Sequence, residues 1–134
     1  MNLLLDTHIL IWALNDDPRL PQKAKDLIMN EDNTIFYSPV SIWEVSIKHA
    51  IHPDKVRFTG KELAQFCEDA GYISVELRDS HVFALETLMR SNDAPQHNDP
   101  FDRMLIAQAK AEHMSFVTHD SLLPYYNEKC IVWV

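Results

Sequence analysis

Four acidic residues each lie next to an apolar segment of the chain: Asp6, Glu44, Asp102 and Asp120. Carboxylates gathered in a low-dielectric place repel one another, and their ionised forms become costly. A divalent cation with oxygen ligands removes this conflict, and carboxylates together with water suit Mg²⁺, with Mn²⁺ as the alternative. The four residues therefore indicate metal-assisted chemistry, on the condition that the fold brings them together.

The stretch Asn98–Ala109 contains the acid that fits an ordinary helix least. Its first two residues are good capping residues, Pro100 suits the first turn, and apolar residues follow at helical spacing. Asp102 lies three residues before Leu105, so its side chain points along the apolar side, where an unpaired carboxylate is costly. The alternative is that Asp102 only completes the helix start, in a capping-box-like arrangement that complements the helix dipole.

Segments typical of strands alternate with segments typical of helices along the chain. The predicted strands are residues 3–5, 34–37, 72–77, 115–118 and 131–133. The predicted helices are residues 7–14, 21–29, 39–51, 61–70, 80–90 and 99–113. This alternation predicts an α/β fold, a three-layer α/β/α sandwich with a mainly parallel central sheet of four to five strands. The length suits a single domain over residues 1–134.

Helical spacing also predicts which side chains are buried. In the helix 39–51, Val40, Trp43 and Ile47 share one side, which places Glu44 at the flank of the buried stripe. In the helix after the third strand, four residues are expected to point inward: Val82, Leu85, Leu88 and Met89. Three aromatic residues at helical spacing are expected to pack in the core rather than stack on nucleotide bases: Trp12, Trp43 and Phe101.

The predicted sheet gives the four acids a common place. In open parallel sheets, ligands bind beyond the carboxyl ends of the strands. Asp6 ends the first strand, and Asp120 lies just past the strand 115–118. Glu44 lies on the helix after the second strand, and Asp102 lies in the first turn of a later helix. A parallel sheet brings these acids toward one edge, although each taken singly is also explained as a cap or an exposed helix residue.

The composition restricts the partners. Hydrophobic residues make up 46% of the 134 residues and only 2 are glycine, which is typical of a globular protein. The formal net charge is −8, with 20 Asp and Glu against 12 Lys and Arg, whereas a protein that binds duplexes by neutralising phosphates is basic. Nucleic acid is then a partner only if something other than side chains, such as a bound cation, supplies positive charge.

Several other chemistries lack the residues that they need. Cys67 and Cys130 have no zinc-ligand spacing and are expected to be reduced thiols of a cytoplasmic protein. The seven histidines form no HExxH pair, and His97 and His119 are expected to be solvated or to surround metal ligands. No glycine-rich phosphate loop and no GxSxG turn are present. No apolar stretch approaches the ~20 residues that cross a bilayer, so no membrane partner is expected.

Four short segments that each contain an acidic residue follow one another along the chain: Asp6-Thr7-His8, Ser41-Ile42-Trp43-Glu44, Asp99 to Ala109, and Phe116 to Asp120. Together they resemble PIN-domain ribonucleases, most closely the VapC-type toxins of bacterial type II toxin–antitoxin systems. The resemblance spans essentially the whole chain. It implies a divalent-metal-dependent endoribonuclease that hydrolyses phosphodiester bonds of single-stranded or loop RNA.

The same resemblance implies roles for individual residues. The catalytic acids that hold Mg²⁺ or Mn²⁺ would be Asp6, Glu44, Asp102 and Asp120. Asp99 would be a further metal ligand, a neighbour of the ligands or the helix cap. Three hydroxyl residues would orient the ligands or a water molecule: Thr7, Ser41 and Thr118. Two basic residues would meet RNA phosphates: Arg103 and Lys48.

Partners also follow from the resemblance, namely a second copy in a homodimer and a cognate VapB-type antitoxin. The antitoxin would lay a helix along an apolar groove formed by Ile9, Trp12, Ile42 and Trp43. Two other functions stay open: a non-catalytic interaction module of the same fold, and a phosphatase or phosphotransfer domain. A haloacid-dehalogenase-type phosphatase would need an aspartate at the position that His8 occupies.

Overall fold

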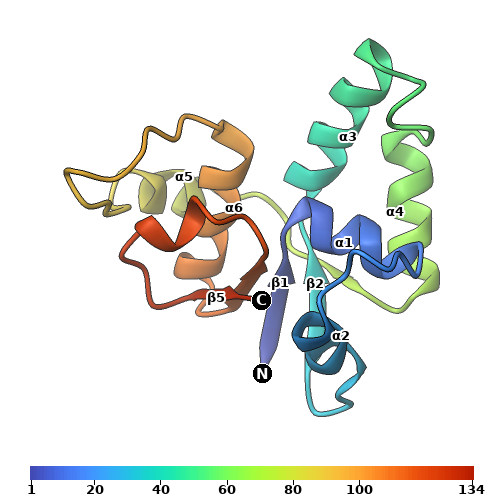
Figure 1. Ribbon diagram of the computed structural model, residues 1–134, viewed down its shortest axis with the longest axis horizontal. Coiled ribbons are helices and arrows are strands. Elements are labelled where there is room, and N and C mark those ends of the chain that lie inside the picture. The colour runs from blue at the N-terminus through green and yellow to red at the C-terminus, as the bar shows by residue number, and fades with distance from the viewer.

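The structure, a computed structural model that describes residues 1–134, is built on a five-stranded sheet (Figure 1). The strands are β1 (Asn2–Leu5), β2 (Thr34–Tyr37), β3 (Ile73–Ser74), β4 (Ser115–Thr118) and β5 (Ile131–Trp133). They lie in the order β3-β2-β1-β4-β5, and every neighbouring pair is parallel. The carboxyl ends of all the strands therefore lie at one edge of the sheet, as the sequence predicts.

Helices cover both faces of this sheet. They are α1 (Thr7–Leu14), α2 (Gln22–Met29), α3 (Pro39–Ile51), α4 (Gly60–Asp69), α5 (Asp79–Leu85) and α6 (Pro100–Ala111), with a short 3₁₀ turn η1 (Leu123–Tyr125). Helices α1 to α4 lie on one side of β1, and α5 and α6 lie on the other (Figure 1). The predicted α/β sandwich is confirmed. None of the helices combines the length and the apolar character that a membrane span requires.

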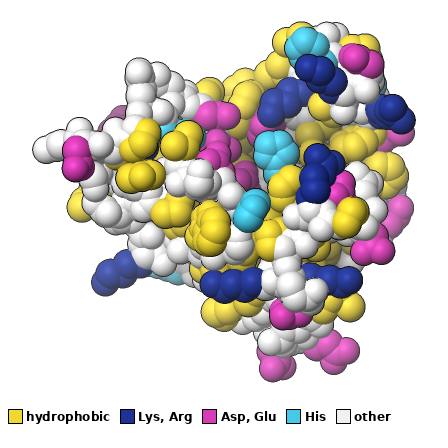
Figure 2. Space-filling model, in the orientation of Figure 1, with side chains coloured by type: hydrophobic (Ala, Val, Ile, Leu, Met, Phe, Trp, Pro, Cys, Tyr) yellow, Lys and Arg dark blue, Asp and Glu magenta, His cyan; other side chains and the backbone are white.

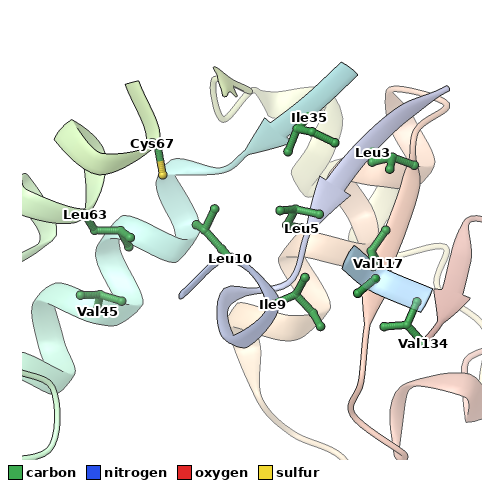
Figure 3. Close-up of a cluster of buried hydrophobic side chains, with 11 residues drawn as sticks. Leu3, Leu5, Ile9, Leu10, Ile35, Val45, Leu63, Cys67, Val117 and Val134 are labelled. Carbon is green, nitrogen blue, oxygen red and sulfur yellow. The ribbon is translucent and has the colours of Figure 1, made fainter. Parts of the chain in front are cut away.

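The central strand β1 is buried on both faces, which explains its unbroken apolar sequence. Leu3 and Leu5 point into one core cluster, which also contains Leu10 of α1 (Figure 3). Leu4 points into the opposite cluster, which contains Phe116 of β4 together with residues of α6. Two packed layers therefore fix the position of the residue that follows β1, which is the first of the predicted acids.

Two elements are shorter than predicted. The strand expected at 72–77 reduces to Ile73–Ser74, because this edge strand pairs with β2 only briefly before the chain turns into α5. The helix expected at 80–90 ends at Leu85, and the Thr87 hydroxyl donates to the Ala84 carbonyl just beyond its end.

The buried side of α5 also differs from the apolar pattern. Val82 and Met89 were expected inward but are 41% and 58% exposed, whereas His81 is fully buried. The His81 ring bonds the Glu112 carboxylate at 2.7 Å through Nε2 and accepts from the Arg78 N–H at 3.0 Å through Nδ1. A polar anchor therefore sets the rotation of this helix, and hydrophobic periodicity does not reveal such an anchor.

Helix α3 is rotated relative to the predicted stripe. Trp43, expected in the core, is 57% exposed and meets the Phe101 ring edge-to-face at 4.8 Å. The buried side of α3 instead contains Ser41 and Glu44, together with Val40 and Val45. Glu44 is thus not at the flank of the buried side but within it, where its polar partners hold it.

The start of α4 lies so close to α3 that only glycine fits. A Cβ at Gly60 would lie 2.0 Å from Ser46 Oγ and 2.9 Å from the Ile42 carbonyl oxygen. We expect Gly60→Ala to lower the free energy of unfolding by about 1–3 kcal/mol, because the two helices must separate. Urea unfolding measures this loss.

A double variant supplies the control for Gly60. Ser46→Ala removes the closest obstructing atom, so the loss in the Gly60→Ala, Ser46→Ala protein should be smaller than the sum of the two single losses. Strict additivity of the two losses would show that Ser46 Oγ is not the obstruction and would leave the Ile42 carbonyl oxygen as its cause.

Candidate metal centre and active site

Asp6 stands at the carboxyl end of β1 and begins α1. Its N–H continues the sheet by donating to the Val117 carbonyl at 3.0 Å, and its Oδ1 accepts from the Thr7 N–H at 2.8 Å as the helix cap. Its Oδ2 accepts from the Thr118 hydroxyl at 2.7 Å. The side chain is 4% exposed, and burial raises the pKa of Asp6 from 3.8 to about 6 despite these hydrogen bonds.

Glu44 enters the site from α3, and Thr7 and Lys48 contact its carboxylate. The Thr7 hydroxyl donates to Glu44 Oε1 at 2.8 Å, so Ser41 Oγ, 2.9 Å away, donates to Thr7 in turn. Lys48, one turn along α3, forms an ion pair with Glu44 Oε2. Glu44 is 3% exposed. The cap of Ser38 on the Val40 N–H fixes where α3 begins and so where Glu44 points.

Asp102 lies in the first turn of α6. Asp99 caps this helix, because its Oδ1 accepts from the N–H groups of Phe101 and Asp102 at 2.9 and 3.2 Å. Burial raises the pKa of Asp102 to about 8, and the negative charges of its acidic neighbours act in the same direction. These neighbours are Asp6, Asp99, Glu44 and Asp120. The five acids therefore lie close enough to repel one another.

Asp120 follows β4 and completes the group. Its N–H donates to Thr118 Oγ1 at 3.1 Å, and its Oδ1 accepts from the Leu122 N–H at 2.9 Å, which holds the turn after the strand. One oxygen of Asp120, one oxygen of Asp102 and one ring nitrogen of His97 lie within 4.8 Å of one another. Strands and helices far apart in the sequence thus converge on one place at the sheet edge.

The remaining predicted site residues lie around these acids. The hydroxyls of Thr7, Ser41 and Thr118 all contact one another or the carboxylates, as described above. Lys48 is partly exposed and forms an ion pair with Glu44. Arg103 lies close enough to His97 to affect its pKa. Burial is the main cause that lowers the pKa of His97, and the positive charges of Arg90 and Arg103 lower it further. The negative charges of Asp120 and Asp99 act in the opposite direction.

The sequence placed His97 near the acidic ligands, but sequence reasoning missed Tyr126 and the contact that links it to Asp102 through His97. His97 Nε2 lies 3.2 Å from Asp102 Oδ2, and His97 Nδ1 lies 2.8 Å from the Tyr126 hydroxyl. His97 stands two residues before the cap of α6, and this position is the sequence signal that points to it. Tyr126 lies far along the chain, and nothing in its local sequence points to the site.

Asp6 and Asp120 line a cavity, and a larger cleft adjoins it. The cavity holds about 250 Å³ and is lined by Asp6, His8, Trp12, His119 and Asp120. The cleft holds about 410 Å³ and also contains His8 and Trp12 in its lining, so the two spaces adjoin. Four basic residues and no acid line the cleft: Arg19, Lys48, Lys55 and Arg57. Figure 2 shows acidic and histidine side chains in a hollow of this face, with Lys and Arg gathered toward the end of α3.

The donor set fits a divalent cation. Carboxylate oxygens dominate the cluster, and such oxygens are the ligands that Mg²⁺ and Mn²⁺ prefer. Burial is the main cause of the raised pKa values of Asp6 and Asp102, and the charges of neighbouring acids add to it, so a bound cation would favour the ionised forms of both groups. The group whose ligand atoms lie within 4.8 Å of one another contains Asp102 and Asp120 together with His97, and it does not include Asp6 or Glu44.

A family profile described as PIN domain matches residues 3–129. The chain belongs to the PIN-domain family. Two solved structures resemble this PIN domain along most of both chains. VapBC2 from Rickettsia felis, bound to a DNA fragment from its promoter, matches with a TM-score of 0.65 and 16% identity, over 100% of this chain and 98% of that chain. FitAcB from Neisseria gonorrhoeae matches with a TM-score of 0.55 and 16% identity, over 90% and 88%.

A search of curated protein sequences gave no match to the PIN domain described here. At 16% identity, the two structural likenesses establish the fold alone. What the PIN domain does must therefore be argued from its own residues.

The raised pKa values make the stability of the PIN domain depend on pH in the absence of divalent cations. The pKa values of Asp6 and Asp102 lie above the ordinary value of 3.8, so the folded state binds more protons than the unfolded state at pH 5 to 8. Stability should therefore fall as the pH rises through this range, by at least about 1 kcal/mol, since one pKa unit corresponds to about 1.4 kcal/mol. Urea unfolding in a chelator at several pH values measures the fall.

Asp102→Asn should reduce this fall, because the amide does not titrate. Asp54→Asn is the matched control, since Asp54 is exposed in the connection between α3 and α4 and lies in a different part of the chain. An equal fall in the Asp102→Asn protein and the unmodified protein would contradict the assignment of the pH dependence to the buried acids.

Proposed function

We propose that the chain is a divalent-metal-dependent endoribonuclease and acts as the toxin of a toxin–antitoxin pair. The observation that carries this proposal is the convergence of Asp6, Glu44, Asp102 and Asp120 at the carboxyl edge of a PIN-domain sheet. Asp6 and Asp99 cap helices, but Glu44 and Asp102 cap nothing, so helix capping does not explain the whole group. This difference favours an enzyme over an interaction module.

In this proposal the chain's own residues prepare the site before substrate binds. The four acids would hold Mg²⁺ or Mn²⁺, while Thr7, Ser41 and Thr118 keep the carboxylates in fixed orientations. When bound, the cation supplies positive charge that offsets the phosphate and favours deprotonation of an attacking water. Lys48 neutralises part of Glu44 and so limits the repulsion among the acids.

The basic cleft supports a polyanionic substrate despite the net charge of −8. Lys55 and Arg57 form no ion pair within the chain, so both are available to phosphates. The cleft adjoins the acids through His8 and Trp12, which allows one strand of RNA to reach the site while its neighbouring phosphates lie along the cleft. Local charge, rather than net charge, then governs binding.

The exposed apolar side of α3 supports a protein partner. Trp43, Ile47 and Ile51 are all exposed there, which is unusual for large apolar side chains on one helix. Together with the likeness to VapBC2 and FitAcB, this side favours docking of a VapB-type antitoxin helix, with a homodimer as the expected assembly. Ile9, which the sequence placed in the antitoxin groove, is fully buried and cannot contribute. A single domain and a cytoplasmic location complete the proposal.

Removal of a single acid tests the enzyme. We expect Asp6→Asn and Asp102→Asn each to lower the rate of RNA cleavage with Mg²⁺ or Mn²⁺ by at least about 100-fold, because charge stabilisation of the phosphate is lost. The two proteins should stay folded, since their amides keep most of the hydrogen bonds. Cleavage of a single-stranded RNA mixture, with mapping of the new ends, measures the rate.

Asp54→Asn again serves as the control and should cleave RNA at the normal rate. The proposal fails if the purified protein cleaves no RNA with Mg²⁺ or Mn²⁺ and if neither cation raises its melting temperature. Formation of an aspartyl-phosphate would instead favour the phosphotransfer alternative.

The cleft is tested by binding rather than by cleavage. In an Asp6→Asn background, the double change Lys55→Ala, Arg57→Ala should weaken binding of a single-stranded RNA oligonucleotide about 10-fold at moderate salt. The dependence of log Kd on log salt should also lose about 1.4 in slope, because two phosphate contacts disappear. Fluorescence anisotropy over a salt series measures both quantities.

Lys25→Ala, Lys129→Ala is the matched control, because it removes the same charge from exposed positions outside the cleft. Equal weakening of RNA binding in the two double variants would show that only the total charge matters and that the cleft does not hold RNA.

A further inference from the structure

His97 places a ring nitrogen in one group with the carboxylates of Asp102 and Asp120. It lies in the loop before α6, and its side chain is only 5% exposed. Its Nε2 lies 3.2 Å from Asp102 Oδ2, and a ring nitrogen of His97 lies within 4.8 Å of both Asp102 and Asp120 oxygens. Adjacent ligands around a small dication, at bond lengths of about 2.1 Å, are about 3 Å apart. The 3.2 Å between His97 Nε2 and Asp102 Oδ2 is a hydrogen-bond distance and is also close to this value, so both atoms can bind one ion without a large movement.

The other ring nitrogen of His97 is fixed in the way that metal-binding histidines require. Metal-ligating histidines usually hold their second nitrogen in a hydrogen bond that sets the tautomer and the ring orientation. Here His97 Nδ1 lies 2.8 Å from the Tyr126 hydroxyl, and the two rings meet edge-to-face at 5.5 Å. An N–H at Nδ1 that donates to Tyr126 leaves the lone pair of Nε2 facing the carboxylates.

Tyr126 is itself held in place. It is almost fully buried, and the Arg90 guanidinium lies 4.9 Å from the centre of its ring. Two buried nitrogens of Arg90, Nε and Nη2, have no hydrogen-bond partner, so the ring face is the main attraction for this cation. A buried aromatic residue and a half-buried cation therefore fix the orientation of His97.

We propose that His97 is a ligand of the cation and that the centre therefore prefers a first-row transition-metal dication, such as Mn²⁺, over Mg²⁺. This inference rests on the proposed function, since it takes the acids to hold a cation. Imidazole nitrogen binds transition metals well, whereas Mg²⁺ strongly prefers oxygen ligands and gives up its waters reluctantly. An all-carboxylate centre has no such preference built into its donor atoms.

Spectroscopy of bound Mn²⁺ tests this ligand directly. The metal-depleted protein is loaded with Mn²⁺, and pulsed electron paramagnetic resonance detects ¹⁴N coupling to the ion. The coupling should appear in the unmodified protein, change when histidine is labelled with ¹⁵N, and disappear in His97→Gln. The absence of coupling in the unmodified protein would overturn the inference without any variant, whereas the variant assigns an observed coupling to His97 rather than to His8 or His119, which line the adjoining cavity.

Calorimetric titration supplies a second readout. His97→Gln should weaken Mn²⁺ binding about 10-fold to 100-fold and Mg²⁺ binding by less than about 3-fold. Tyr126→Phe should weaken Mn²⁺ binding by a smaller factor, because His97 stays but loses its brace. His113→Gln is the matched control, since His113 is exposed at the end of α6, and should bind both cations normally.

The outcomes separate this inference from the proposed function. If Mn²⁺ binds without ¹⁴N coupling, or if His97→Gln weakens both cations equally, His97 only braces Asp102 and the inference is overturned while the nuclease proposal stands. If the unmodified protein binds neither cation, the metal centre itself is refuted and the inference falls with it.

Discussion

Repulsion among buried carboxylates is the constraint on which the arrangement of this PIN domain depends. Five acids lie close together at the edge of the sheet, and burial together with the charges of the other four acids raises the pKa of Asp102 to about 8. Such a group persists only where the surrounding structure is rigid enough to hold it. The two packed layers around β1 provide that rigidity, because they bury the strand on both faces directly before Asp6. The well-packed core around β1 therefore lies directly beside the buried acids, whose ionisation destabilises the fold.

Local devices moderate the repulsion without removing it. The N-terminal ends of α1 and α6 carry partial positive charge, and Asp6 and Asp99 cap those helices. Hydroxyls of Thr7 and Thr118 donate to the carboxylates, and Lys48 pairs with Glu44. The same contacts that make the acids tolerable also fix their directions. The same hydrogen bonds therefore stabilise the fold and orient the carboxylates, so a substitution that removes one of them affects both.

Two neighbouring regions of the surface carry opposite charge. The acids lie at the sheet edge, while Arg19, Lys48, Lys55 and Arg57 line the adjoining cleft without an acid among them. Their charges are local, so the formal net charge of −8 says little about what binds there. Lys48 belongs to both regions, since it pairs with Glu44 and lines the cleft.

The sequence alone determined the order of strands and helices and the place of the acids at strand ends and helix starts. These features depend on neighbouring residues, through apolar runs, caps such as Asp99 and the position of Pro100. Only the tertiary structure decided the rotation of α3 that buries Glu44 and exposes Trp43, the burial of His81, and the contact of His97 with Asp102 and Tyr126. Each of these depends on a polar partner or a packing surface from another part of the chain. Hydrophobic periodicity carries no information about such a partner.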